Sequence, residues 1–215
     1  MKVAIEEFIK DVRVAIDMNR RDESLAGAGD LDTLELDEAI RSKICDGIDL
    51  THQESPLMLL EPKDIGGYTN GTISLDGRGV GRITLPEDFL RFVYFHLYGW
   101  QQGVYEAYYP GDPRFDMQGS RWAGIYGTKE RPAVTIEPRT EGLILSFYSG
   151  TPNAEHGAIS TALYIPRATI TEEEEVEVSR GCYRSAVYRT AGLVLAGYGD
   201  ELSGVMIKQS EGMLG

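Results

Sequence analysis

Histidine and cysteine side chains most often ligate metals or carry out acid-base and nucleophilic chemistry, and this chain has three histidines and two cysteines. His52, His96 and His156 fall in a predicted helix, a predicted strand and a loop, without the close paired spacing of local metal-binding motifs. Cys45 and Cys182 fall in predicted helices and form no CxxC pair, which favours two small buried thiols over a disulfide or a metal site. We therefore expect no metal and no cofactor.

A glycine-rich string, Gly77-Arg78-Gly79-Val80-Gly81, has the composition of a nucleotide-binding loop. Its spacing is GxGxG rather than GxGxxG, and it leads into a predicted strand instead of opening a helix. A hairpin turn is the better interpretation. The chain also contains no GxxxxGK[ST], GxSxG or HExxH motif.

Carboxylates are plentiful, so counting alone does not exclude a hydrolase that uses a pair of them. Glu87-Asp88 lies at a predicted corner and Glu172-Glu175 at a predicted helix start, where acidic residues have structural roles. A sugar-binding platform is a second alternative, built from Trp100, Tyr105, Tyr108, Tyr109 and Trp122. Such aromatics are more often core and interface residues. We therefore expect no enzyme.

The composition is that of a folded protein, with 215 residues of which 42% are hydrophobic. A net charge of −13 and a pI near 4.7 argue against a general nucleic-acid binder, because an acidic surface repels phosphates. The first helix is amphipathic and acidic, and no apolar stretch reaches the length of a membrane span. We expect a soluble protein made in a reducing compartment, without membrane contact.

The densest apolar and aromatic run of the chain extends from Arg82 to Trp100 and should be a core strand. Pro86 cannot donate to a sheet, which predicts a corner between a short strand ending near Leu85 and a longer one starting near Phe89. Alternate residues of the longer strand are apolar on both faces. Both faces should therefore be covered, by more sheet or by a neighbouring molecule.

Helices are predicted at the start of the chain. Apolar residues at three- and four-residue spacing predict a helix from about residue 2 to residue 18, namely Ile5, Phe8, Ile9, Val12 and Ile16. A second helix is predicted from Thr33 to Glu54, with Asp32 or Thr33 as N-cap and Pro56 beyond its end. The first quarter of the chain should be a helical hairpin.

After Pro56 the apolar period changes to two, which is typical of a β unit. Strands are predicted near residues 57–60, 68–75, 81–85, 89–98, 103–108, 133–137, 142–148 and 159–165. The segment 109–131 is long and irregular and mixes aromatic with basic residues, which favours a contact surface.

Helix is predicted again from Thr171, which with Glu174 forms a capping box, to a C-cap at Gly199. Asp200 can cap a last helix. The predicted fold class is α+β: residues 1–56 and 168–215 form a helical bundle, and residues 57–167 form an inserted antiparallel domain resembling a β-sandwich or barrel.

This layout resembles the head-to-tail adaptor, or connector, proteins of tailed bacteriophages. Three segments carry the resemblance. The helical opening EFIKDVRVAIDMN is followed by LDEAIRSKICDGIDL, and the centre reads ITLPEDFLRFVYFHLYGW. The end, YRSAVYRTAGLVLAGYGDELSGVMIKQSEGML, joins an alanine-containing helix to an amphipathic helix through a Gly-Asp break.

The resemblance implies a structural virion protein at the neck, made in the cytoplasm of the host bacterium. It implies a homo-oligomeric ring, usually a dodecamer, that contacts the portal protein and the tail or stopper proteins. DNA would pass through the channel without sequence-specific binding. The alternative that the residues leave open is a carbohydrate-binding or tail-tip module, based on the aromatic residues of the stretch 109–131.

Two groups of residues are predicted to contact other proteins. Trp100, Phe115, Arg121, Trp122 and Tyr126 are candidates for contacts with a neighbouring copy or the tail. Tyr183, Arg184, Tyr188 and Arg189 on the third helix are candidates for contacts with the portal or a neighbouring copy, and packing within the bundle is the equal alternative.

Overall fold

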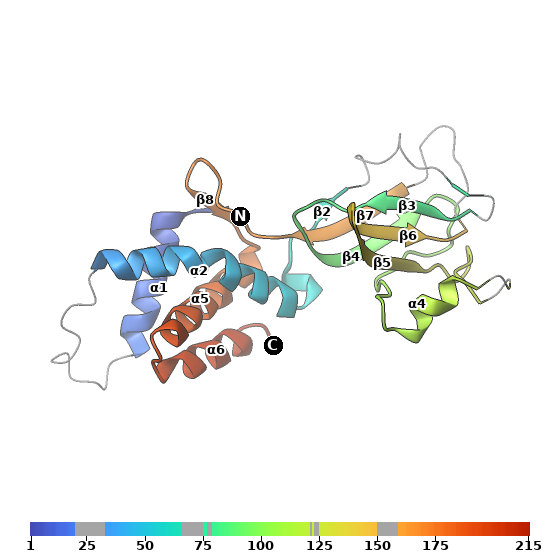
Figure 1. The fold of residues 1–215 in the computed structure, drawn as a ribbon. Coiled ribbons are helices and arrows are strands. Elements are labelled where there is room, and N and C mark those ends of the chain that lie inside the picture. Colours follow the sequence, from blue (N-terminus) through green and yellow to red (C-terminus); the bar gives the residue numbers. More distant parts are fainter. Residues whose placement is uncertain (20–32, 66–74, 77–78, 121, 123–124, 150–158) are drawn as a thin grey trace. The chain divides into compact units, whose positions relative to one another are not determined.

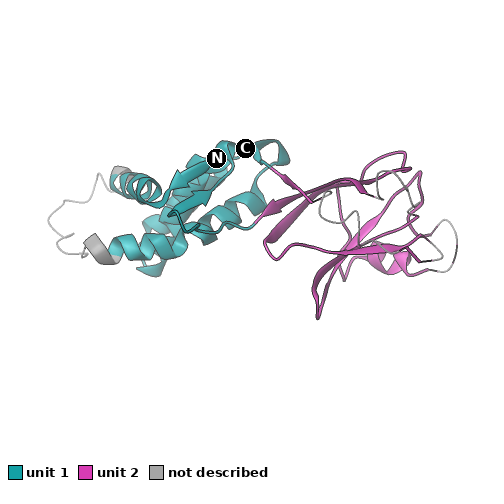
Figure 2. Cartoon of the chain, turned by 90° about the horizontal axis from the view of Figure 1, so that it is seen from above, with its two compact units in different colours: residues 1–61, 167–215 teal, residues 62–166 magenta. Residues whose placement is uncertain are grey.

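The computed structural model describes residues 1–19, 33–65, 75–76, 79–120, 122, 125–149 and 159–215 (Figure 1). Within these residues α-helices and three small antiparallel sheets are both present, in keeping with the predicted α+β class. The chain divides into two compact units (Figure 2). Residues 1–61 and 167–215 form the first, called the helical unit, and residues 62–166 form the second, called the β unit.

The helical unit contains α1 (Ile5–Asn19), α2 (Thr33–Glu54), α5 (Tyr183–Gly197) and α6 (Leu202–Gly212). Their apolar faces meet in one core, whose fully buried members include Phe8, Val12, Ile40, Ile44, Ile48, Ala186, Ala191 and Met206. Segments from the two ends of the chain therefore bury each other's apolar stripes, which a short helical hairpin could not do alone.

Helices α2 and α5 approach closely where Gly47 faces Thr190. A Cβ atom placed on Gly47 would lie 2.1 Å from Thr190 Oγ1 and 3.0 Å from Thr190 Cα. Glycine at this position lets the two backbones come together, and a larger side chain would have to push them apart.

A two-stranded sheet completes the helical unit and corrects a prediction. β1 (Lys2–Ala4) pairs with β8 (Glu175–Glu177), so the first helix begins at Ile5 and not at Lys2. The predicted helix start at Thr171 is wrong. Thr171 N–H donates to the Glu175 carbonyl across a tight turn in which Glu174 has a φ of 57°. The third helix, α5, begins only at Tyr183.

The end of α5 is close to its predicted position. Gly199 follows the helix with a φ of 72°, the left-handed conformation that glycine adopts without strain. Asp200 Oδ1 then accepts a hydrogen bond of 2.9 Å from Leu202 N–H at the start of α6. The N-cap residue of α6 is Glu201, one residue after the predicted Asp200, but the Asp200 side chain still satisfies the first amide of the helix.

The β unit contains two three-stranded antiparallel sheets. One has the order β2 (Lys63–Asp64), β7 (Ile159–Pro166), β4 (Phe89–Leu97). The other has the order β3 (Gly81–Thr84), β6 (Gly142–Phe147), β5 (Val134–Arg139). A short helix, α4 (Pro113–Gln118), lies in the segment that the sequence predicted to be irregular.

Both sheets contribute to one apolar core. Phe95 of β4 and Phe147 of β6 stack with ring centroids 5.5 Å apart, and Trp100 packs edge-on against Phe95 at 5.8 Å. The core face of β4 is thus covered by the other sheet of the same unit. Within the described residues the strands do not close into a barrel.

Other strand predictions differ from the structure. Residues 57–59 form the 3-10 helix η1 (Leu57–Leu59) instead of a strand. Residues 103–108 make only two isolated bridges. The predicted strand 68–75 lies outside the described residues except for Leu75, and so do Gly77 and Arg78 of the predicted hairpin turn.

The units of the structure divide after Glu61 and after Pro166, whereas the sequence placed the divisions after residues 56 and 167. Residues 57–61 belong with the helical unit because they pack on η2 (Arg180–Cys182) and its neighbours. Glu61 N–H donates to Ser179 Oγ at 3.1 Å, and the Cys182 thiol donates to the Leu59 carbonyl at 3.6 Å. No helix among the described residues is both long and apolar enough to cross a membrane.

Candidate interaction surface

Large apolar side chains reach solvent mainly on one stretch of the β unit, residues 98–131, called the aromatic segment. Six of the eleven large apolar side chains that the described residues expose belong to it, namely Tyr98, Tyr105, Tyr109, Met117, Trp122 and Ile125. Trp122 is 76% exposed and Tyr105 is 71% exposed. Exposed aromatic side chains that cluster in this way are typical of surfaces that contact another molecule.

The start of the aromatic segment is held by the backbone to both sheets. Val104 exchanges two hydrogen bonds with Phe95 of β4, of 2.8 and 2.9 Å. Tyr108 N–H donates to the Val134 carbonyl, and its own carbonyl accepts from Ile136 N–H of β5. Residues 104–108 therefore join the β4 edge of one sheet to the β5 edge of the other.

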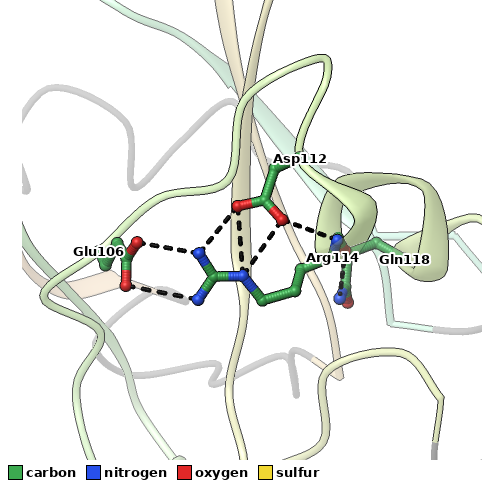
Figure 3. A network of polar contacts seen from close by, with 4 residues as sticks. All are labelled: Glu106, Asp112, Arg114 and Gln118. Carbon is green, nitrogen blue, oxygen red and sulfur yellow. Dashed lines mark hydrogen bonds and ion pairs between the residues drawn. The ribbon is translucent and has the colours of Figure 1, made fainter.

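Arg114 organises the middle of the segment (Figure 3). Asp112 is the N-cap of α4: its Oδ1 accepts from Arg114 N–H at 2.8 Å, and both of its carboxylate oxygens accept from the guanidinium. The guanidinium also donates to Glu106 at 3.0 Å and lies 4.4 Å from the Tyr108 ring centroid. Hydrogen bonds to Asp112 and Glu106 raise the pKa of Arg114, and the Arg114 guanidinium lowers the pKa of Asp112.

These ion pairs are exposed, so each adds little stability, but together they fix the path of the chain between Glu106 and Arg114. The bidentate geometry and the ring contact restrict the guanidinium to one orientation. Tyr109, which lies in this stretch, is thus displayed from a defined backbone.

Gln118 holds the end of the segment. It is 8% exposed; its amide Nε2 donates to the Arg114 carbonyl at 3.0 Å, and its Oε1 accepts from Gly127 N–H at 2.7 Å. Ser149 Oγ donates to the Gly127 carbonyl at 2.8 Å. A Cβ on Gly127 would lie 2.8 Å from Ala133, so the chain can return to β5 only with glycine here.

The five residues predicted to contact a neighbouring copy or the tail differ from one another in how far they are exposed. Trp122 is exposed, and Phe115 on α4 and Tyr126 are half-buried. Trp100 is 5% exposed and belongs to the core, so it offers little surface to another protein. Arg121 lies outside the described residues.

The four predicted contact residues of α5 mostly pack within the helical unit. The Tyr183 hydroxyl donates to Asp11 Oδ2 at 2.6 Å, and burial raises the pKa of Tyr183. Arg189 is 5% exposed and forms an ion pair with Glu54. Tyr188 is half-buried and only Arg184 is exposed. Tyr183 and Arg189 therefore pack within the helical bundle, which was the alternative to a contact with another protein.

The negative charge is concentrated in the helical unit. By sequence count it holds 23 acidic and 12 basic residues, whereas the β unit holds 11 and 9. The net charges are −11 and −2, which together make the −13 of the chain. The aromatic segment therefore belongs to the nearly neutral unit, where charge repulsion between copies is weaker.

His52 and the two cysteines, whose side chains could carry out chemistry, are held in environments that make them less reactive. His52 is buried, which lowers its pKa to about 4, and its Nε2 accepts from Ser179 N–H at 3.2 Å. Burial raises the pKa of both thiols, which makes Cys45 and Cys182 poorer nucleophiles. In the described parts of the chain, no three His, Cys, Asp or Glu side chains gather as a metal site.

Sequence reasoning missed the residues that shape the surface, Glu106, Asp112, Arg114 and Gln118. One signal was available: Asp112-Pro113 is an N-cap followed by proline at the first helical position. The partners of Arg114 and Gln118 depend on how the segment folds back, which no local spacing shows. Comparison of the sequence with models of protein families gives no match, and comparison with curated proteins gives none either.

Proposed function

We propose that this chain is a structural assembly protein, a head-to-tail adaptor of a tailed bacteriophage that joins the portal to the tail as a ring around the DNA. The three sequence segments that resemble such adaptors are one support. In this proposal the β unit is an antiparallel sandwich inserted into a helical bundle.

The observation that carries the proposal is the aromatic segment. The exposed side chains of Tyr105 and Tyr109 stand on a backbone tied to both sheets and to α4, so little conformational freedom is lost when a partner covers them. Tyrosine and tryptophan supply large contact area with few rotatable bonds, which suits them to protein interfaces. Tyr105 and Trp122 are therefore the side chains that we propose as the centre of the contact.

The charge distribution supports the same function. A helical unit with a net charge of −11, repeated around a ring, would repel the phosphates of DNA. DNA could then move past the helical unit without binding to it. The nearly neutral β unit would make the contacts between proteins.

The experiment is native mass spectrometry of the purified chain, alone and mixed with the portal protein of a phage whose genome encodes the chain. We expect a monomer that assembles on the portal, or a ring of about twelve copies. Trp122→Ala combined with Tyr105→Ala should reduce assembly at least tenfold. Met58→Ala is the matched control, because Met58 is 88% exposed but lies in the helical unit.

A chain that stays monomeric with and without portal would contradict the proposal. So would assembly that the double variant leaves intact, since it would move the contact away from the aromatic segment. Electron cryomicroscopy of virions gives an independent check, because an adaptor must be found at the neck.

A further inference from the structure

A pocket of about 290 Å³ lies on the side of the β3-β6-β5 sheet that faces away from the core. Register places Arg82, Ser146 and Thr135 side by side across the three strands. Their neighbours along the strands, such as Ile83, Leu145 and Ile136, belong to the core face. Helix α4 forms another wall of the pocket through Phe115, Asp116 and Gln118.

Three polar side chains of the pocket make no hydrogen bond or ion pair with another side chain that the structure describes. Ser146 is 5% exposed, and its hydroxyl has no hydrogen-bond partner among the described residues. Arg82 and Asp116, one cation and one anion, also form no ion pair with any residue that the structure describes. The Ser146 hydroxyl is not one of the buried polar atoms shut off from solvent, so all three groups are open to a ligand that enters the pocket.

The remaining polar groups of the pocket are engaged. Glu137 forms an ion pair with Arg139, and Thr135 Oγ1 is 3.2 Å from the Tyr148 hydroxyl. Asp76 Oδ1 accepts from Val80 N–H at 2.9 Å in the turn before β3. The ligand would therefore meet mainly the guanidinium of Arg82, the carboxylate of Asp116 and the hydroxyl of Ser146.

These groups favour a neutral ligand over a charged one. A carboxylate drawn to Arg82 would be repelled by Asp116, and an ammonium group drawn to Asp116 would be repelled by Arg82. Neighbouring hydroxyl groups on one neutral molecule can donate to Asp116 and accept from Arg82 and Ser146 at the same time.

We infer that the pocket binds a neutral saccharide. The rings of Phe115 and Tyr148 also line it and supply apolar surface for the C–H face of a sugar. Ligand pockets typically have about 300–1,000 Å³, so this one is at the lower limit and suits a single sugar unit. The inference uses other residues than the aromatic segment's exposed side chains and does not depend on the adaptor function.

The test is an array of neutral glycans probed with the full chain, followed by calorimetric titration of the strongest neutral glycan. We expect saturable binding that weakens about fivefold or more in Ser146→Ala, which removes a hydroxyl, and in Asp116→Asn, which removes the charge of an acceptor. Arg82→Gln, at an exposed position, should weaken binding as well. Circular dichroism checks that each variant is folded.

Trp122→Ala is the control, because Trp122 is outside the pocket and should change the affinity less than twofold. Binding lost in Trp122→Ala but kept in the pocket variants would overturn the inference and favour a surface platform. No saturable binding to any neutral glycan, or binding of free L-arginine or L-glutamate in its place, would also overturn it. Ser146→Ala should assemble like the wild type, so failure here leaves the adaptor proposal standing.

Discussion

The contact between Gly47 and Thr190 sets the spacing of α2 and α5, so Gly47→Ala should destabilise the protein. Alanine usually stabilises a helix by about 1 kcal/mol relative to glycine, but overpacking of a core costs about 1–3 kcal/mol. Because Thr190 is fully buried and its backbone lies within 3.0 Å of the new Cβ, the cost should prevail. Gly204→Ala in α6 meets nothing within 4 Å and should stabilise by about 0.5–1 kcal/mol. Urea unfolding followed by ellipticity at 222 nm measures the stability of both variants. If Gly47→Ala stabilised the protein as Gly204→Ala does, the close contact between Gly47 and Thr190 would be contradicted.

His52 should make stability depend on pH. Its pKa of about 4 in the folded chain lies below the ordinary value of 6.5, so the unfolded chain binds the proton more readily. The neutral form stabilises the fold above pH 6.5, and this contribution is lost as the pH falls toward 4. The full effect is on the order of 3 kcal/mol. His52→Gln, whose amide oxygen can still accept from Ser179 N–H, should show a shallower fall in unfolding free energy between pH 6.5 and 5. Equal slopes would show that His52 does not titrate differently on folding.

At the scale of elements, Gln118 should control the order of the aromatic segment. Gln118→Ala leaves the buried Gly127 N–H without an acceptor, which costs about 1–3 kcal/mol, and the Gly127 amide should exchange its hydrogen faster. Gln102→Ala is the matched control, because Gln102 is exposed and its side chain donates to the Glu130 carbonyl at 3.2 Å, a solvent-accessible bond. It should change stability by less than about 0.5 kcal/mol. Equal effects of the two variants on amide exchange would show that Gln118 does not hold the segment.

The sequence predicted elements well where one periodicity dominates. α2 matches its predicted bounds of Thr33 and Glu54, and β4 begins at Phe89 as expected after Pro86. The prediction for the segment after Thr171 failed because a capping box and an acidic run are local signals, whereas β8 forms by pairing with β1 at the other end of the chain. The alternation of Glu175, Val176 and Glu177, with Val176 fully buried, was the strand pattern that competed with them.

The candidate surface was only partly predictable for a related reason. The composition of residues 109–131 indicated a contact segment, and Trp122 is exposed there. Trp100 is also aromatic and lies close in sequence, but it turns into the core against Phe95, and composition does not distinguish the two. Pocket residues such as Ser146 and Asp116 come together only when α4 lies over the sheet, so no spacing pattern indicated them.

At the scale of the whole molecule, the unequal charge of the two units predicts an unequal response to salt. The Debye length falls from about 30 Å at 0.01 M to about 8 Å at 0.15 M, which screens repulsion within the helical unit with its net charge of −11. Exposed ion pairs such as Lys43–Asp46 weaken with salt, but each contributes only about 0.2–1 kcal/mol. The helical unit should therefore gain stability from salt, and the nearly neutral β unit should change little.

The two tryptophans allow this difference to be measured, because Trp100 and Trp122 both belong to the β unit. Tryptophan fluorescence thus follows unfolding of the β unit, while ellipticity at 222 nm mainly follows the helical unit. In urea titrations, raising NaCl from 0.01 to 0.15 M should move the ellipticity midpoint upward more than the fluorescence midpoint. Equal shifts would mean that the units unfold as one cooperative body. A downward shift in ellipticity would mean that ion pairs outweigh net repulsion, so the acidic excess would not be the dominant electrostatic property of the helical unit.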